Sequence, residues 1–221
     1  MKKPSPALID RMIRRVRRYV ERCREPHVTE EARVGRDPFR VLISCVLSLR
    51  TKDATTAAAS QRLFALADHP EAMLGLSERQ IARTIFPVGF YNTKARNIRA
   101  ICRRLLDDHG GRVPDTMDEL LALPGVGRKT ANLVLTMGYG KPGICVDTHV
   151  HRISNHWGWV ESKTPEPTET ALRGFLPRRY WIEFNNWLVT FGQNCCLPVS
   201  PHCSICPVES DCPKVGVTRH R

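Results

Sequence analysis

A lysine and an aspartate that could carry covalent chemistry lie in one stretch, residues 123–150, which reads LPGVGRKTANLVLTMGYGKPGICVDTHV. Lys129 follows a Gly-Val-Gly turn and falls in the first turn of the helix that we predict after it. A cation there faces the positive end of the helix dipole, and Arg128 adds like charge. These two effects, together with partial burial, favour the neutral amine that a nucleophile requires. The alternative is that Lys129 is a second phosphate-binding lysine.

The turn before Lys129 has the composition of an anion site. The glycines of Gly125-Val126-Gly127 let the backbone approach a ligand closely, and N–H groups at the start of the next helix attract anions. Because no nucleotide-binding sheet is predicted, DNA phosphate is the expected anion. The alternative is a helix–turn–helix connection that only needs glycine.

Asp147 either caps the helix that follows it or acts together with Lys129. Positions 129 and 147 are 18 apart. A helix of about 12 residues covers ~18 Å, and the remaining chain can return at up to ~3.3 Å per residue, so the two side chains can meet. His149 and His151 resemble a metal pair, but without a third nearby ligand such a pair is more typical of structural or DNA-facing residues.

Four cysteines near the end of the chain have the spacing C-x6-C-x2-C-x5-C: Cys196, Cys203, Cys206 and Cys212. In a reducing compartment this pattern indicates a metal centre rather than disulfides. Tetrahedral zinc and a cubane iron–sulfur cluster both take four cysteines. Zinc ribbons usually use two C-x2-C pairs and only one is present, so the wide spacings favour a cluster. Cys195 competes with Cys196 as the first ligand.

The composition indicates a nucleic-acid partner. The chain of 221 residues carries a formal net charge of +12, with 42% hydrophobic and 25% charged residues. Excess Lys and Arg attract polyanions, although a basic surface can also serve solubility. No apolar run reaches the ~18 residues of a membrane span, and the first residues do not resemble a secretory signal. We therefore expect a cytoplasmic, nucleoid-associated protein with no membrane contact.

Hydrophobic periodicity predicts an all-helical fold, because no alternating run is long enough for a sheet. Residues 8–20 place an apolar stripe on one face: Ile9, Met12, Ile13, Val16 and Val20. Asp37-Pro38 is a typical helix start. Further helices are expected near residues 53–66, 70–74, 77–85, 93–108, 114–123, 127–138, 147–157, 168–176 and 180–192, with a connector at 23–34 and a loop at 159–167.

The expected helix 93–108 is amphipathic. It has an apolar face of Ile98, Ile101, Cys102 and Leu105. Its basic residues are placed elsewhere on the helix: Lys94, Arg96, Arg99, Arg103 and Arg104. This pattern predicts that the apolar face packs against other helices and that the basic residues lie off that face.

Four motifs together resemble those of endonuclease III, in the helix-hairpin-helix DNA glycosylase superfamily. They are LPGVGRKTAN, VDTHVHR, the GFYNTKA turn and the cysteine loop, and the resemblance covers roughly residues 8–213. It implies two helical domains: a six-helix barrel with the helix-hairpin-helix at 31–141, and a discontinuous domain at 1–30 and 142–221. The second domain would carry a [4Fe–4S] cluster, and DNA would bind in the groove between the two.

The resemblance also implies the activity, a bifunctional DNA glycosylase and AP lyase of base excision repair. Such enzymes flip a damaged base, mainly an oxidised pyrimidine, out of double-stranded DNA. Lys129 matches the nucleophile that attacks the sugar C1′ and forms a Schiff base, after which β-elimination cuts 3′ to the abasic site. Asp147 matches the carboxylate that assists it. No nucleotide cofactor is implied, and a monomer is expected.

Two further positions match the family's DNA-distorting loops. Phe90 occupies the position of a wedge residue, often leucine, that enters the base stack. The alternative is that Phe90 packs inside the barrel and Tyr91 makes the contact. Arg50 replaces a glutamine that fills the space left by the flipped base, so its preference for the partner base should differ. The expected DNA-binding residues are Arg50, Phe90, Gly125, Val126, Gly127, Arg128 and His149.

The loop between the first two cysteines is less basic than in relatives. Its sequence LPVSPH contains only His202 where relatives often place Lys or Arg, so this loop should contact phosphates more weakly. Affinity should then depend on the hairpin and on basic residues elsewhere.

Three other functions remain open on the sequence. An adenine-mismatch glycosylase needs a carboxylate near residues 44–45, where this chain has Ser44 and Cys45. A thymine-mismatch glycosylase can carry tyrosine at the lysine position, which Lys129 argues against. A non-catalytic iron–sulfur DNA-binding protein would not need both Lys129 and Asp147.

Overall fold

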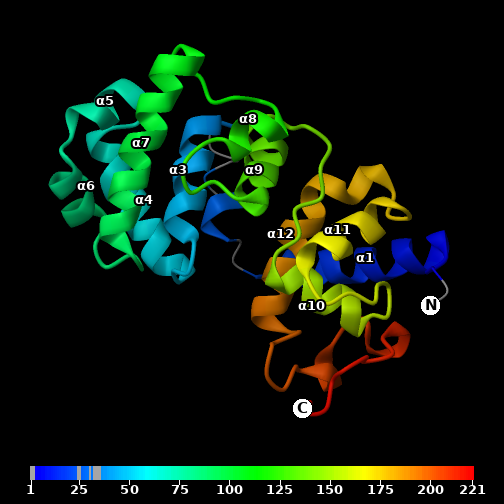
Figure 1. The fold of residues 1–221 in the computed structure, drawn as a ribbon. Coiled ribbons are helices and arrows are strands. Elements are labelled where there is room, and N and C mark those ends of the chain that lie inside the picture. The colour runs from blue at the N-terminus through cyan, green and yellow to red at the C-terminus, as the bar shows by residue number, and fades with distance from the viewer. Residues whose placement is uncertain (1–2, 24–25, 30, 32–35) are drawn as a thin grey trace. The chain divides into compact units, whose positions relative to one another are not determined.

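The computed structural model describes residues 3–23, 26–29, 31 and 36–221, and it divides into two compact units. One unit is continuous, His27–Lys141, and the other combines Met1–Pro26 with Pro142–Arg221. Every regular element in the described residues is a helix, which confirms the predicted all-α class (Figure 1). Our assignment of residues 31–141, and of 1–30 with 142–221, as functional domains stays a prediction, as does the groove between them.

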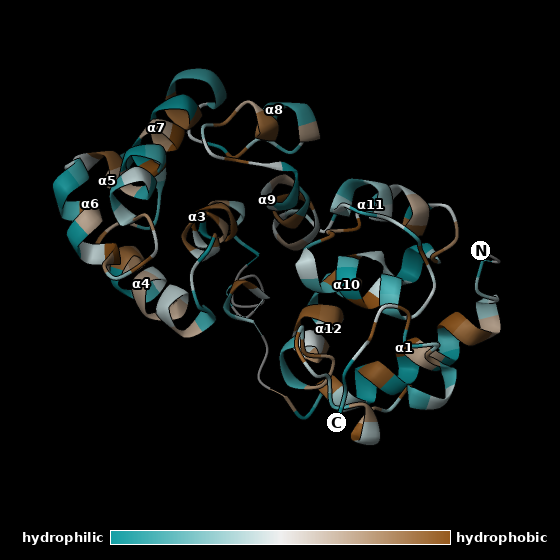
Figure 2. Ribbon diagram, turned by 60° about the horizontal axis from the view of Figure 1, so that its bottom comes forward, coloured by the Kyte–Doolittle hydropathy of each residue, from teal (hydrophilic) through white to brown (hydrophobic). Residues whose placement is uncertain are grey.

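The unit His27–Lys141 is built around one buried helix, α3 (Pro38–Ser48). Asp37 caps it by accepting a 2.8 Å hydrogen bond from the Phe39 N–H, and Pro38 opens the first turn, as predicted. Because α3 is hydrophobic on nearly all sides, other helices must surround it (Figure 2). Those in contact with α3 are α4 (Asp53–Leu66), α7 (Tyr91–His109), α9 (Arg128–Leu133) and the π-helical turn η1 (Val134–Gly138).

Three shorter helices complete this unit: α5 (Pro70–Gly75), α6 (Glu78–Ile85) and α8 (Met117–Leu121). Ser77 and Gln80 form a reciprocal capping box at the start of α6. α7 ends at Gly110, whose φ of 58° is the left-handed conformation typical of a helix C-terminus.

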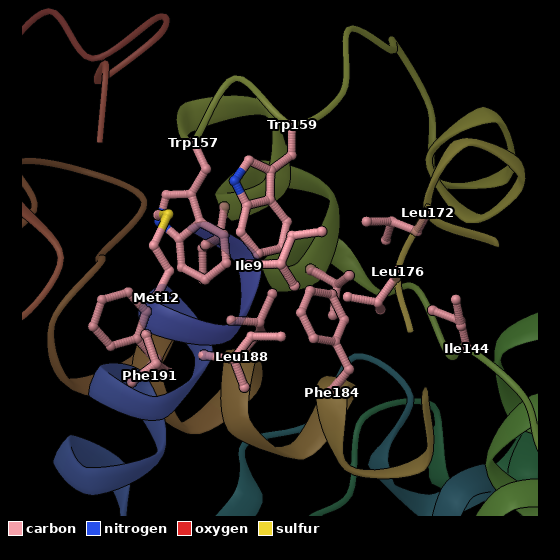
Figure 3. Packing of buried hydrophobic residues seen from close by; sticks show 14 of the residues in the cluster. Ile9, Met12, Ile144, Trp157, Trp159, Leu172, Leu176, Phe184, Leu188 and Phe191 are labelled. Carbon is pink, nitrogen blue, oxygen red and sulfur yellow. The ribbon is translucent and has the colours of Figure 1, made fainter. Parts of the chain in front are cut away.

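The second unit has an aromatic core between α1 (Pro6–Val20), α10 (Thr148–His156), α11 (Pro165–Arg173) and α12 (Trp181–Asn194). All five residues of the stripe predicted on α1 are buried. Figure 3 shows Trp157 and Trp159 packed above Phe184 and Phe191 of α12. The Trp159 and Phe184 rings stack at 6.3 Å, within the range of favourable aromatic pairs.

Several predicted boundaries differ from the structure. The helix expected at 114–123 is confined to α8, and the helix expected at 127–138 changes from α to π geometry at Val134. The loop expected at 159–167 ends earlier, because α11 begins at Pro165 with Thr164 as its N-cap. The connector expected at 23–34 lies partly outside the described residues, and residues 27–29 within it are helical.

Lys94 is buried, with 6% of its surface exposed, although it lies off the apolar face of its helix. The helical pattern put it off the apolar face of α7, but its position one turn into the helix brings its ammonium group against the end of α3. Hydrogen bonds to oxygen atoms there satisfy the buried cation.

Candidate functional site

The turn between α8 and α9 is the predicted hairpin. The Val126 N–H closes it with a 3.2 Å bond to the Leu123 carbonyl, and Gly125 adopts a φ of 75°. A Cβ on Gly125 would also lie 2.5 Å from the Asn97 amide nitrogen, so this position requires glycine for two reasons. Gly127 differs, because a Cβ there would meet only open space. The backbone at Gly127 is therefore accessible to a ligand.

Lys129 is exposed in the first turn of α9, so the expectation of partial burial was wrong. No side chain caps the N-terminus of this helix. The charge of Lys129 acts on Cys45 in α3: burial raises the pKa of that thiol to about 12, and the nearby ammonium opposes the rise. The hairpin therefore presents Lys129 at the surface, beside the buried face of α3.

A second lysine in the same unit, Lys94, has a lowered pKa, as a nucleophilic amine requires, but its amine is not accessible to a substrate. Burial lowers the pKa of Lys94 to about 8. Its Nζ nonetheless donates to the Leu47 carbonyl at 2.8 Å, to the Leu49 carbonyl at 2.5 Å and to the Thr51 hydroxyl at 3.1 Å. A substrate carbon cannot reach an amine that is buried among three oxygen atoms. Accessibility thus favours Lys129 as the nucleophile.

Asp147 is the N-cap of α10, which was one of its two predicted roles. Its Oδ1 accepts 2.9 Å hydrogen bonds from the N–H groups of His149 and Val150. The residue is only 7% exposed, so its carboxylate has a fixed position. Asp147 belongs to one unit of the fold and Lys129 to the other. The catalytic role of Asp147 stays a prediction.

The two histidines of the H-x-H pair have separate partners within their unit. His149 is half-buried, its Nδ1 lies 3.3 Å from the Arg152 guanidinium, and a Cβ on Gly192 would collide with its ring. His151 bonds to the Thr168 hydroxyl at 2.7 Å. No sequence pattern predicts that Gly192 of α12 makes room for His149. The DNA-binding role of His149 stays a prediction.

All four cysteines of the predicted metal centre line one pocket, at the end of α12, and Cys195 lines it with them. Burial raises the pKa of Cys196 to about 12. A hydrogen bond between the thiols of Cys195 and Cys206 raises the pKa of the first and lowers that of the second to about 7. The Cys195 thiol also lies 3.7 Å from the His202 carbonyl.

The pocket lining fits a metal centre that is held by four cysteines. Among the described residues, no three His, Cys, Asp or Glu side chains converge as the ligands of a single ion. Tetrahedral zinc requires all of its sulfur ligands at ~2.3 Å from one point. In a cubane cluster each cysteine binds a different iron, and four cysteines around one pocket fit this ligand set. The choice of a cluster over zinc stays a prediction from the wide cysteine spacing.

Arg50 and Phe90 lie on two adjacent loops and stack on each other. The Arg50 guanidinium carbon is 4.9 Å from the centre of the Phe90 ring. Phe90 is 59% exposed, so the alternative that it packs inside the barrel is wrong. Tyr91 is half-buried and packs edge-on against Phe86 at 5.4 Å. Phe90 is therefore the more accessible of the two candidate wedge residues.

Both stacked residues have an unfavourable backbone. Arg50 has a φ of 53° and Phe90 a φ of 58°, in the left-handed region. Such non-glycine residues cost on the order of 1–3 kcal/mol each. An exposed cation–π contact contributes only about 0.5–1 kcal/mol. The stacking alone cannot hold the two loops, so the surrounding contacts must do so.

The sequence missed the residues that support these loops, chiefly Lys94 and Thr51. Lys94 has a long charged side chain in a helix with five basic residues, a pattern typical of a solvated face. The GFYNTKA motif contains Lys94, but its buried position depends on contacts with α3 that are distant in the chain.

The comparison with protein families identifies the chain. Residues 43–178 match the model described as HhH-GPD superfamily base excision DNA repair protein. Endonuclease III of Thermotoga maritima is 49% identical over 176 residues, covering 80% of this chain and 83% of the relative. Endonuclease III of Escherichia coli (strain K12) is 39% identical over 187 residues, covering 85% and 88%. Endonuclease III-like protein 1 of Bos taurus is 40% identical, and the match spans 63% of its length.

Solved structures agree with the sequence matches. A trapped covalent intermediate of endonuclease III with DNA has a TM-score of 0.84 at 32% identity, covering 96% of this chain and 97% of the other. A thermostable thymine-DNA glycosylase has a TM-score of 0.73 at 25% identity, covering 91% and 97%. Within the described residues, every helix is too short or too polar to cross a membrane. The chain belongs to the endonuclease III family, in the HhH-GPD superfamily of base excision DNA repair proteins.

Proposed function

We propose that this chain, a DNA glycosylase and AP lyase of the endonuclease III family, removes oxidised pyrimidines from double-stranded DNA with Lys129 as its nucleophile. The observation that carries the proposal is the hairpin, which combines an accessible backbone at Gly127 with an exposed amine two residues later. Related endonuclease III has been solved both in a non-covalent DNA complex and as a trapped covalent intermediate. Covalent trapping implies a nucleophile on the protein.

The reaction starts when the neutral amine of Lys129 attacks C1′ of the damaged nucleotide. The N-glycosidic bond breaks, and the base leaves with the bonding electron pair and takes up a proton. The C1′–O4′ bond then opens, O4′ is protonated, and a protonated Schiff base forms between Nζ and C1′. Loss of a proton from C2′ expels the 3′ phosphate, which cuts the strand by β-elimination.

Asp147 would stabilise positive charge on the sugar and help to activate Lys129. Its two hydrogen bonds from the start of α10 hold the carboxylate in one position. Stabilisation of this kind is effective because the charge is already in place before the transition state forms.

The cysteine pocket would hold a [4Fe–4S] cluster through Cys196, Cys203, Cys206 and Cys212. All four cysteines line one pocket, and their wide spacing in the sequence supports a cluster over zinc. When bound, the cluster supplies a structural centre that ties the end of α12 to the cysteine loop. Anaerobically purified protein should be brown and contain about four irons per chain. Protein that contains zinc and no iron would overturn the assignment.

Borohydride trapping tests the nucleophile. Reduction converts the Schiff base to a stable amine, so wild-type protein incubated with duplex containing thymine glycol should form a covalent adduct. Lys129→Ala should form none, while Lys163→Ala, which changes an exposed lysine of the other unit, should react as wild type. Adduct formation by Lys129→Ala at the wild-type rate would refute the role of Lys129.

The choice of duplex tests the substrate class. Thymine glycol, a G·T mismatch and an A·G mismatch present an oxidised pyrimidine, a mismatched thymine and a mismatched adenine. We expect base release mainly from the first. Preferential release of thymine or adenine from undamaged mismatches would contradict the proposal and favour a mismatch-specific glycosylase.

A further inference from the structure

The loop that carries Arg50 and the loop that carries Phe90 are connected by a partly buried hydrogen-bond network. Thr51 is central to it. Its hydroxyl accepts hydrogen bonds from the Gly89 N–H and from the Lys94 ammonium, both at 3.1 Å, and donates to the Leu49 carbonyl at 3.3 Å. Each member of the network is therefore satisfied by a group on the other loop or on the end of α3.

Lys94 links the same two loops with both its backbone and its side chain. Its N–H donates to the Phe90 carbonyl at 3.0 Å, closing the first turn of α7. Its Nζ donates to the Leu47 and Leu49 carbonyls, which lie at the end of α3 directly before Arg50. One residue thus fixes the backbone on both sides of the stacked pair.

Gly89 allows the two loops to touch. A Cβ on Gly89 would lie 2.8 Å from the Arg50 carbonyl oxygen, closer than real Cβ atoms approach. Only glycine lets the backbone before Phe90 lie directly on the backbone of Arg50. The loops are therefore in backbone contact, and the Lys94 and Thr51 network lies beneath that contact.

We propose that Lys94 is a positioning residue, which acts through Thr51 to hold Arg50 and Phe90 as one preformed element before DNA is bound. The left-handed backbone of each stacked residue requires such support. A preformed element does not have to order its loops during binding, so its side chains enter DNA together. The inference rests on the proposed function only for what the element does on DNA, because its existence concerns the free protein.

An NMR experiment on the free protein tests the element without DNA. The Phe90 ring should shift the Arg50 Nε–Hε resonance upfield; Arg50→Gln assigns that resonance and Phe90→Leu removes the ring. We expect Lys94→Met and Thr51→Val to return the resonance to its unstacked position. Thr51→Ser, which keeps the hydroxyl, should preserve the shift. Arg103→Met, an exposed cation on the same helix, is the matched control.

The NMR outcomes test whether the preformed element exists, separately from what it does on DNA. A shift that persists in both Lys94→Met and folded Thr51→Val overturns the proposal. If Lys94→Met does not fold by circular dichroism, Thr51→Val and Thr51→Ser decide alone.

A second measurement uses DNA. It compares the cleavage rate for thymine glycol opposite guanine with the rate opposite adenine, as a ratio. This ratio should change at least threefold in Lys94→Met, toward that of Arg50→Gln, whereas a merely structural lysine would lower both rates equally. Lys129→Ala should keep the NMR shift while losing all cleavage. The preformed element can therefore be measured even if the proposed role of Lys129 is wrong.

A different surface in the other unit suggests a further DNA contact. The last four residues of the sequence, Thr218–Arg221, are all exposed and include Arg219, His220 and Arg221; we call them the basic tail. The tail is attached to the cysteine loop, because the Arg221 N–H donates to the Pro201 carbonyl at 3.0 Å and the Ser204 N–H donates to the Arg221 carbonyl at 3.2 Å.

The tail lies beside a loop that lacks its own cations. Residues 197–202 contain His202 as their only basic side chain, and Val199 is 79% exposed among them. Both backbone hydrogen bonds are made by Arg221, so they place this residue next to the segment, and Arg219 lies two residues before it. We infer that the basic tail contacts DNA phosphates in place of the cysteine loop.

The salt dependence of DNA binding tests this inference. Each phosphate contact that is lost should lower the slope of log Kd against log salt concentration by about 0.9. Arg219→Gln with Arg221→Gln should therefore lower the slope by about 2 on an abasic-site duplex. Arg14→Gln with Arg18→Gln makes the same charge change on exposed residues of α1 and should lower it less. An unchanged slope, or equal slopes for the two double variants, overturns the inference, whether or not the enzyme cuts DNA.

Discussion

The guanidinium carbon of Arg50 lies 4.9 Å from the centre of the Phe90 ring, and both residues have a left-handed backbone. The two side chains thus form a stacked pair at the surface rather than two independent contacts. A planar cation and an aromatic ring can both stack on bases, and the cation also donates hydrogen bonds. The pair is suited to fill the space that a flipped nucleotide leaves.

Arg50 should bias the enzyme toward lesions opposite guanine. A guanidinium only donates hydrogen bonds, and guanine offers the two acceptors O6 and N7, whereas adenine presents an amino donor beside its acceptors. A good bidentate contact discriminates by about 1–3 kcal/mol. Arg50→Gln should therefore reduce the preference for thymine glycol opposite guanine over adenine by roughly tenfold. Single-turnover rates on the two duplexes measure it.

Phe90→Leu is the matched control for the same substrates. It removes the aromatic ring but leaves the guanidinium donors, so both rates should fall while their ratio changes less than in Arg50→Gln. Equal ratios in wild type and Arg50→Gln would show that Arg50 does not read the partner base.

Substitutions of Asp147 can separate its role as a helix cap from its proposed role in catalysis. Asparagine caps helices about as well as aspartate, so Asp147→Asn should keep the stability within about 0.5 kcal/mol, whereas Asp147→Ala should lose about 1 kcal/mol. Both lack the carboxylate, and both should slow borohydride trapping by roughly 100-fold or more. Urea unfolding and trapping rates give the two quantities.

Asp37→Asn provides the comparison for Asp147→Asn. Asp37 also caps a helix through its carboxylate, at the start of α3. Asp37→Asn should therefore keep both the stability and the trapping rate of wild type. If Asp147→Asn traps as fast as Asp37→Asn, Asp147 is only a cap.

The sequence predicts those features that depend on local rules. The α1 stripe from Ile9 to Val20 follows from helical periodicity, and the start of α3 follows from Asp37-Pro38. The Gly125 turn follows from glycine, although its collision with Asn97 does not. The burial of Lys94 depends on its contacts with α3, which no local pattern contains.

Substitution can decide whether Cys195 or Cys196 is the first ligand of the metal centre. Cys195 and Cys196 both line the pocket, but we expect only Cys196 to bind iron. Cys196→Ser should lose most of its iron and its brown colour, because the irons of such clusters are held by cysteine thiolates. Cys195→Ser should keep about four irons. The reverse result would assign Cys195 as the first ligand.

Lys94 should make the stability depend on pH. Burial lowers the pKa of Lys94 to about 8 in the folded protein, while a free lysine has a pKa of ~10.4. Between these values the unfolded chain binds more protons than the folded one, so the contribution of Lys94 to stability rises with pH. The free energy of unfolding of wild type minus that of Lys94→Met should increase by roughly 1–3 kcal/mol from pH 7 to pH 10.

The difference between the two proteins cancels the titration of other groups, including the cysteines. Urea unfolding at four pH values measures it, with wild type minus Arg103→Met as a reference that should stay flat. A difference that falls with pH would mean that the ammonium is favoured, not disfavoured, by its three oxygen partners.

The two glycines of the hairpin should respond differently to alanine. Gly125→Ala places a Cβ against Asn97 at a φ of 75°, so it should lower stability by about 1–3 kcal/mol. Gly127→Ala meets open space at a φ of −99°, so stability should stay the same or rise by up to about 1 kcal/mol. If a DNA phosphate approaches the backbone at Gly127, the added methyl group should still weaken DNA binding, by roughly tenfold in fluorescence anisotropy. Wild-type affinity in Gly127→Ala would exclude a phosphate at this point of the hairpin.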